Sequence, residues 1–240
     1  MTRRRVVGEV ILVEDGAALA QMAARRIAAF LREAVDARGS ASVLLAGGNT
    51  PTPAYRLLAS PPLVTAVPWA RTTVFFGDER CVPPEDPASN FRAATEALLS
   101  RVPLGRGQVH RMEAERADRD QAARDYERLL PRLPDLVMLG MGPEGHVASL
   151  FPGSAALGEE LRRVVVVETP KPPPFRLTIT PPVIAAARQV LVLVAGEDKA
   201  EAVARTLEGD EPPEVFPARL AARGIWIVTR DAARGLSRRN

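Results

Sequence analysis

The chain has one cysteine, two histidines and two lysines among its 240 residues. A single thiol, Cys81, cannot form a disulfide within the chain and excludes a zinc site built from several cysteines. A reducing compartment is the simplest setting for this composition, so we expect a cytoplasmic protein. No basic partner for Cys81 is evident in the sequence, and we interpret it as an inert thiol.

Long apolar runs are also lacking. No run approaches the ~20 residues that a membrane-spanning helix needs. The start, MTRRRVVGEV, is basic, but Glu9 and Glu14 interrupt the apolar segment that a signal peptide requires. The formal net charge is only +3, and the basic residues are spread along the chain without interleaved aromatics. We therefore expect neither a membrane nor a nucleic acid as a partner.

What remains is an ordinary soluble composition, with 46% apolar and 25% charged residues. Short apolar runs alternate with segments of helical periodicity. The apolar runs predict strands at 9–13, 42–46, 72–76, 135–139, 164–167, 176–180, 190–195 and 225–228. The periodic segments predict helices at 16–38, 51–59, from Ser89 or Asn90 to Leu99, 117–130, 182–188 and 199–208.

Several of these strands are apolar at consecutive positions, which is typical of strands covered on both faces. The alternation therefore predicts a mostly parallel, Rossmann-like sheet with helices on both faces. We expect a single-domain three-layer α/β sandwich over residues 1–240. Ligands of such sheets bind beyond the carboxyl ends of the strands, which directs attention to loops 46–51, 77–90, 140–146 and 195–199.

The loop after strand 135–139 has the spelling G-x-G-x-x-G, from Gly140 to Gly145. With Glu168 at the end of a later strand, this pattern is compatible with a dinucleotide site. Two features oppose that interpretation. Pro152-Gly153 should end the following helix after about two turns, and Pro143 has no N–H to offer a pyrophosphate.

The alternative is that these glycines form a tight turn that places His146 at the end of the strand. A lone histidine is most often structural, but its position on a glycine-rich loop after a strand favours a chemical role. His110 has no such context, and we expect it to be structural.

Two further loops and three basic residues have features suited to anion binding. AGGNTP (46–51) is either a plain strand–helix turn or a phosphate site at a helix N-terminus. In FFGDERC (75–81), Arg80 suits a bidentate clamp on a phosphate or carboxylate, and Asp78 suits a sugar hydroxyl or the orientation of His146. A surface ion pair is the simpler alternative. Lys171, Lys199 and Arg176 are additional candidate anion ligands. Together these loops indicate a small phosphorylated substrate and histidine acid–base chemistry.

Four segments in this order resemble the signature stretches of the 6-phosphogluconolactonases, and the resemblance covers nearly the whole chain. They are AGGNTP, FFGDERCVPPEDPASN, DLVMLGMGPEGHVASLFPG and KPPPFRLTIT…GEDKA. The resemblance implies a single α/β domain that hydrolyses a phosphorylated sugar lactone without a metal or cofactor. It makes His146 the general base, with Glu144 and Asp78 also at the catalytic centre. Substrate contacts are implied for Gly47, Gly48, Asn49, Thr50, Arg80, Asn90, Lys171, Arg176 and Lys199.

Two positions depart from the family pattern. Asn49 replaces the usual serine, and Glu144 replaces the usual aspartate before the Gly-His pair. A related glucosamine-6-phosphate deaminase/isomerase is the alternative enzyme, but its catalytic glutamate falls in a segment that is apolar here, SLFPG (149–153). A catalytically inactive sugar-phosphate-binding protein is the non-enzymatic alternative. The sequence leaves a monomer and a homodimer equally open.

Overall fold

Six parallel strands form the central sheet of the computed structural model, which describes residues 8–237. Residues 1–7, part of the segment considered above as a signal peptide, lie outside the described residues. The strand order is β1-β9-β8-β5-β2-β3. The strands are β1 (Val10–Val13), β2 (Ala41–Leu45), β3 (Thr72–Phe76), β5 (Leu136–Gly140), β8 (Gln189–Val194) and β9 (Ile225–Thr229). The predicted α/β class and parallel sheet are confirmed.

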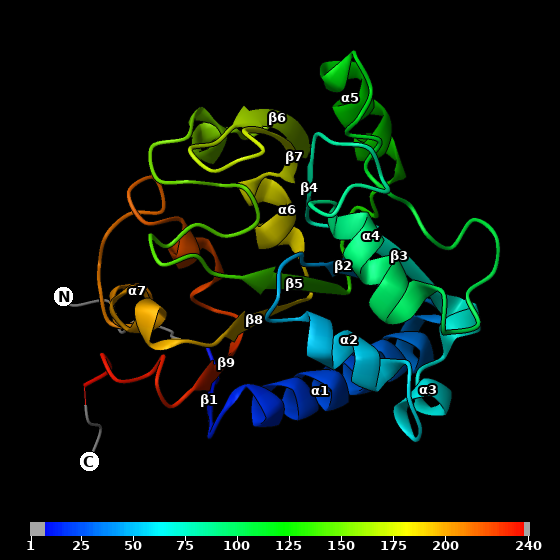
Figure 1. Ribbon diagram of the computed structural model, residues 1–240, viewed down its shortest axis with the longest axis horizontal. Helices are drawn as coiled ribbons and strands as arrows, with labels where there is room; N and C mark the ends of the chain where they lie inside the picture. The colour runs from blue at the N-terminus through cyan, green and yellow to red at the C-terminus, as the bar shows by residue number, and fades with distance from the viewer. Residues whose placement is uncertain (1–7, 238–240) are drawn as a thin grey trace.

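Helices cover both faces of this sheet (Figure 1). One apolar core joins the sheet to α1 (Gly16–Arg38), α2 (Thr52–Leu58), α3 (Leu63–Ala66) and α4 (Asn90–Ala94), which continues as a π-helical turn, Thr95–Leu99. The opposite core joins it to α5 (Arg119–Leu129), α6 (Pro181–Ala186) and α7 (Ala200–Leu207). Short 3₁₀ turns lie at Trp69–Arg71, Ala155–Gly158, Glu197–Lys199 and Pro217–Ala221.

Helix α1 shows how local chemistry sets these boundaries. Asp15 is its N-cap and accepts a hydrogen bond from the N–H of Ala18 at 2.8 Å. Gly39 ends the helix in the left-handed conformation at φ 77°, which a glycine adopts without steric cost. The predicted bounds of 16–38 are therefore confirmed.

A second, antiparallel sheet of three strands corrects the expected topology. Its order is β4-β7-β6, with β4 (Asp78–Arg80), β6 (Val164–Glu168) and β7 (Phe175–Ile179). Segments 164–167 and 176–180 were predicted as strands, but they leave the parallel sheet. Segment 77–90 was expected to be a loop throughout, because the charged sequence DER carries no apolar strand signal.

The chain beyond Gly145 also differs from expectation. A two-turn helix was expected between Gly145 and Pro152, but the residues there form a succession of turns. Ala148 adopts φ 50°, a left-handed conformation that is rare outside glycine. The absence of a helix here removes the structural basis of a dinucleotide-binding turn.

Gly77 joins the two sheets. Its N–H donates to the carbonyl of Leu45 in β2, and its carbonyl accepts from the N–H of Ile179 in β7, each at 2.9 Å. The chain therefore passes directly from β3 of the parallel sheet into β4 of the antiparallel sheet.

The order in which the chain adds strands to the main sheet reverses between β2 and β5, although these two strands run parallel. From β2 the chain moves outward to β3, whereas β5, β8 and β9 extend the sheet the other way. Loops at the carboxyl ends of β2 and β5 therefore diverge, which opens a crevice where ligands bind in such sheets. Among residues 8–237, no helix is long and apolar enough to cross a membrane.

Candidate active site

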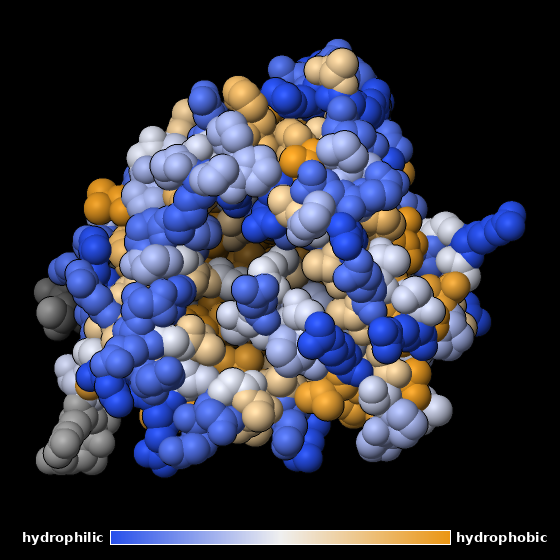
Figure 2. All heavy atoms as spheres, viewed as in Figure 1, coloured by the Kyte–Doolittle hydropathy of each residue, from blue (hydrophilic) through white to orange (hydrophobic). Residues whose placement is uncertain are grey.

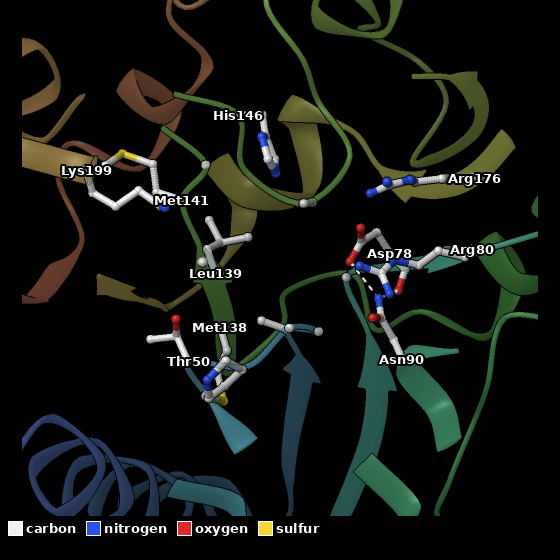
Figure 3. Close-up of a pocket in the computed structure, with 18 of the residues that line it drawn as sticks. Thr50, Asp78, Arg80, Asn90, Met138, Leu139, Met141, His146, Arg176 and Lys199 are labelled. Carbon is white, nitrogen blue, oxygen red and sulfur yellow. Dashed lines mark hydrogen bonds between the residues drawn. The ribbon is translucent and has the colours of Figure 1, made fainter. Parts of the chain in front are cut away.

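A cleft opens at this crevice, between the parallel sheet and the small antiparallel sheet. Figure 2 shows a central hollow with mainly hydrophilic side chains around it. In Figure 3, His146 projects into the cleft, Arg176, Asp78, Arg80 and Asn90 gather at one end, and Lys199 lies at the other. The predicted residues that line the cleft are Gly47, Gly48, Thr50, Asp78, Arg80, Asn90, His146, Arg176 and Lys199.

Three predicted residues are not part of this lining. Asn49 is exposed. Glu144 and Lys171 pair with each other instead, with the Lys171 Nζ 2.7 Å from the Glu144 Oε1. Lys199, at the edge of the cleft, forms an ion pair with its neighbour Asp198.

The loop after β2 is shaped by close contact with Asn90. A Cβ on Gly47 would lie 1.9 Å from the Asn90 Oδ1, so only glycine fits. Gly48 has φ 92°, again a glycine conformation. Tyr55 holds the base of the loop, because its hydroxyl donates to the Ala46 carbonyl at 2.7 Å and accepts from the Ala46 N–H at 3.1 Å.

Asp78 is held by two neutral donors. The Asn90 Nδ2 donates to its Oδ1 at 3.1 Å and to its backbone carbonyl at 2.9 Å. The Ser149 hydroxyl donates to its Oδ2 at 2.6 Å. Asp78 is only 7% exposed, so these donors fix its orientation toward the cleft.

Glu79 alternates to the other side of β4 and anchors the loop that follows. Its carboxylate accepts from the N–H groups of Asn90 at 2.8 Å and Phe91 at 2.7 Å, and from the Ser89 hydroxyl at 3.1 Å. Burial raises the pKa of Glu79, and the backbone donors partly offset that effect. The carboxylate thereby closes the loop from Arg80 to Asn90 onto the helix start.

Two guanidinium groups stand side by side at one end of the cleft. Arg80 and Arg176 are directly paired in the β4–β7 register. Arg80 NH1 donates to the Ala88 carbonyl at 2.6 Å, whereas its buried Nε has no hydrogen-bond partner among the described residues. The buried Asn90 Oδ1 also lacks a partner there. Two neighbouring cations beside unused polar atoms form an arrangement suited to an anionic, hydroxylated ligand.

The glycines of the loop after β5 position His146. A Cβ on Gly142 would lie 2.1 Å from the His146 Nδ1, and a Cβ on Gly145 would lie 2.4 Å from the Phe216 ring. The Gly142 N–H also donates to the His146 carbonyl at 3.0 Å. The imidazole stacks on Phe151 with ring centroids 4.2 Å apart and an interplanar angle of 18°.

The surroundings of His146 favour its neutral form. Burial lowers its pKa, Lys171 lowers it further, and Glu144 acts in the opposite direction. The His146 Nδ1 lies 3.2 Å from the Glu144 Oε1, close enough for the carboxylate to stabilise a protonated imidazole. Nδ1 is thus the nitrogen beside the carboxylate, and Nε2 faces away from it.

Glu144 carries a negative charge beside this histidine. Burial acts to raise its pKa, but the hydrogen bond from Lys171, a backbone hydrogen bond and the positive charge of Lys171 outweigh burial and lower the pKa overall. No group of three or more histidine, cysteine or acidic side chains suited to a metal ion occurs among residues 8–237.

Sequence reasoning missed three residues that shape the site: Ser149, Phe151 and Tyr55. Ser149 is fully buried and lies 71 positions from its partner Asp78. Phe151 and Tyr55 look like ordinary core residues in sequence. Their apolar or hydroxylic side chains carry no local signal for a site, and only tertiary contacts identify them.

Comparison with known proteins places these features in a family. The family model of the glucosamine-6-phosphate isomerases/6-phosphogluconolactonases matches residues 14–228. The 6-phosphogluconolactonase of Mycobacterium tuberculosis is 40% identical over 91% of this chain and 94% of its own. That of Streptomyces coelicolor is 38% identical over 96% and 95%. The solved 6-phosphogluconolactonase of Trypanosoma cruzi superposes with a TM-score of 0.84 at 27% identity, covering 99% of this chain and 100% of its own. The chain therefore belongs to the family of glucosamine-6-phosphate isomerases and 6-phosphogluconolactonases.

Proposed function

We propose that this protein hydrolyses 6-phospho-D-glucono-1,5-lactone to 6-phospho-D-gluconate, a step of the oxidative pentose phosphate pathway. Relatives that carry the 6-phosphogluconolactonase name align with nearly the whole chain. The observation that carries the proposal is a partly buried histidine, whose surroundings favour its neutral form, in a cleft that also holds two paired arginines.

His146 is the general base of the proposed reaction. Its Nε2 takes a proton from a water molecule, and the water oxygen attacks the lactone carbonyl carbon. Negative charge develops on the carbonyl oxygen, where Arg80 or N–H groups of the surrounding loops stabilise it. Protonated His146 then returns the proton to the ring oxygen as the C–O bond breaks, which leaves a carboxylic acid that ionises in water.

The rest of the cleft binds and orients the substrate. Gly47, Gly48, Thr50 and Lys199 form one group of candidate phosphate or sugar contacts. Arg80, Asn90 and Arg176 form another, with Asp78 as an acceptor for a sugar hydroxyl. Binding the remote phosphate supplies orientation at the reacting carbon, which lowers the barrier to reaction.

Phe151 argues against the deaminase alternative. It occupies the place where the deaminase segment carries its acid–base glutamate, and its ring is stacked on His146. An aromatic ring cannot transfer a proton there. We therefore expect no release of ammonia from glucosamine 6-phosphate by a preparation of the protein that hydrolyses the lactone. Ammonia release without lactone hydrolysis would reverse the assignment.

Substitution of His146 tests the proposed base. We expect His146→Ala to lower kcat by ~10²–10⁴, the usual worth of general base catalysis, with little change in KM. The measurement is lactone hydrolysis by pH-stat with freshly made substrate. His110→Ala is the matched control, because His110 stacks on Phe75 and does not line the cleft. Near-normal hydrolysis by His146→Ala would exclude it as the base. A wild-type protein that binds 6-phosphogluconate but hydrolyses no lactone would indicate the inactive sugar-phosphate binder.

A further inference from the structure

Lys171 lies in the connection between β6 and β7, on a backbone that is held in place. Its carbonyl accepts hydrogen bonds from the Thr169 hydroxyl at 3.1 Å and from Arg176 NH2 at 3.4 Å. Its side chain turns toward the loop after β5, where Nζ lies 2.7 Å from the Glu144 Oε1. Lys171 thus connects the small sheet to the loop that carries His146.

One carboxylate oxygen serves two neighbours. The Glu144 Oε1 that contacts Lys171 is also 3.2 Å from the His146 Nδ1. The other oxygen, Oε2, is buried and has no hydrogen-bond partner among the described residues. Lys171 is therefore the group that fixes where the carboxylate lies relative to the imidazole.

Phe151 contacts two of these residues, His146 and Lys171. Its ring is stacked on His146, and the Lys171 Nζ lies 5.7 Å from its centroid. A cation at this distance from an aromatic face is attracted to it. The carboxylate and the ring thus both favour an ammonium at this place, and Lys171 is not among the residues that line the cleft.

We propose that Lys171 is a positioning residue, which acts through Glu144 to hold His146 in its working orientation and protonation state, and not a ligand of the substrate phosphate. This inference rests on the proposed role of His146 in lactone hydrolysis. It also accounts for the glutamate at position 144, whose extra methylene relative to aspartate allows one oxygen to lie between an ammonium and an imidazole.

The charges around His146 determine in which direction its pKa should change when Lys171 or Glu144 is replaced. Glu144, Lys171 and Asp78 act on the imidazole directly, and Arg176 and Lys199 line the same cleft. Removing the Lys171 cation removes a charge that opposes protonation and leaves Glu144 free to pair with His146, so the pKa of His146 should rise. Removing the Glu144 charge should lower it.

Histidine NMR titration measures this pKa without reference to activity. The chain has only two histidines, and His110→Gln assigns their signals. We expect Lys171→Met to raise the midpoint of His146 by at least about 0.3 pH unit, a twofold change in protonation equilibrium. Glu144→Gln should lower it, Lys171→Arg should stay near wild type, and the His110 midpoint should not move.

The pH dependence of the steady-state kinetics provides a second test. The acidic limb of kcat/KM should shift with the His146 midpoint in Lys171→Met, and kcat should fall while KM and the affinity for 6-phosphogluconate stay near wild type. An unchanged His146 midpoint in Lys171→Met overturns the proposal, and a several-fold loss of 6-phosphogluconate affinity would assign Lys171 to the phosphate instead. Failure of the proposed function would appear separately, as a wild-type protein that hydrolyses no lactone.

Discussion

At the scale of single residues, the site depends on glycines that leave space for the side chains of His146, Glu144 and Asn90. The G-x-G-x-x-G motif suggested a dinucleotide-binding site. Gly142 is instead the residue against which the side chains of His146 and Glu144 pack. The histidine was found from sequence because it lies on a glycine-rich loop after a strand, and Asp78 and the two arginines because they closely follow or begin predicted strands. Ser149 and Phe151 were not, because their partners are distant in sequence or lie within a turn that only the folded chain reveals.

Gly142→Ala should therefore damage catalysis more than stability. Its Cβ would lie 2.1 Å from the His146 Nδ1 and 2.5 Å from the Glu144 Oε2, so the imidazole must move. A displacement of about 1 Å at a reacting group costs on the order of 100-fold in rate. We expect kcat to fall by about that factor while the thermal midpoint changes little. Gly158→Ala is the control, because a Cβ there meets nothing within 4 Å; a kcat near wild type in Gly142→Ala would show that the loop accommodates the methyl group.

At the scale of elements, the two tyrosines of the chain hold the carboxyl ends of neighbouring strands. The Tyr55 hydroxyl binds both the N–H and the carbonyl of Ala46 after β2, and the Tyr126 hydroxyl binds both the N–H and the carbonyl of Phe76 at the end of β3. Burial raises the pKa of both hydroxyls, so both remain neutral donors. They fix the points from which the loop at Gly47 and strand β4 depart.

Tyr55→Phe should weaken both folding and substrate binding. It leaves a buried N–H and carbonyl unpaired, which costs about 1–3 kcal/mol in the free energy of unfolding. The loss lies at the base of the Gly47–Gly48 loop, so KM should also rise. Thr72→Val is the control: it removes a buried hydroxyl that donates to the Pro68 carbonyl at the opposite end of β3. Denaturant unfolding and steady-state kinetics on both variants are the measurements, and an unchanged KM in Tyr55→Phe would separate this tyrosine from the site.

The strands of the parallel sheet were predictable because runs such as SVLLA and VLVLV are apolar on both faces. The small sheet was not. The strands β6 and β7 were recognised, but periodicity does not say which neighbour a strand pairs with. The strand β4 consists of three charged residues, and its pairing depends on β7, which comes almost a hundred residues later.

At the scale of the whole molecule, the paired arginines make ligand binding a source of stability. Arg80 and Arg176 repel each other until an anion lies between or beside them. A ligand at 100 times its Kd stabilises the native state by about 2.7 kcal/mol. For a chain of this size each kcal/mol corresponds to about 2–4 °C, so the expected rise in Tm is about 5–10 °C.

Thermal unfolding with 6-phosphogluconate and with gluconate checks this expectation. The phosphorylated acid should raise Tm and gluconate should not, because it lacks the dianion. Arg176→Ala should reduce the rise, since one of the two cations is removed. Equal shifts with both acids would mean that the cleft binds the carboxylate or hydroxyls and leaves the phosphate unrecognised.

The backbone of Gly77 belongs to both sheets at once, with its N–H bonded to β2 and its carbonyl to β7. The two sheets are therefore tied together at a single residue, and moving one sheet away from the other there would break one of these two hydrogen bonds. We expect substrate entry and product exit to depend more on displacement of the loops around the cleft than on separation of the sheets.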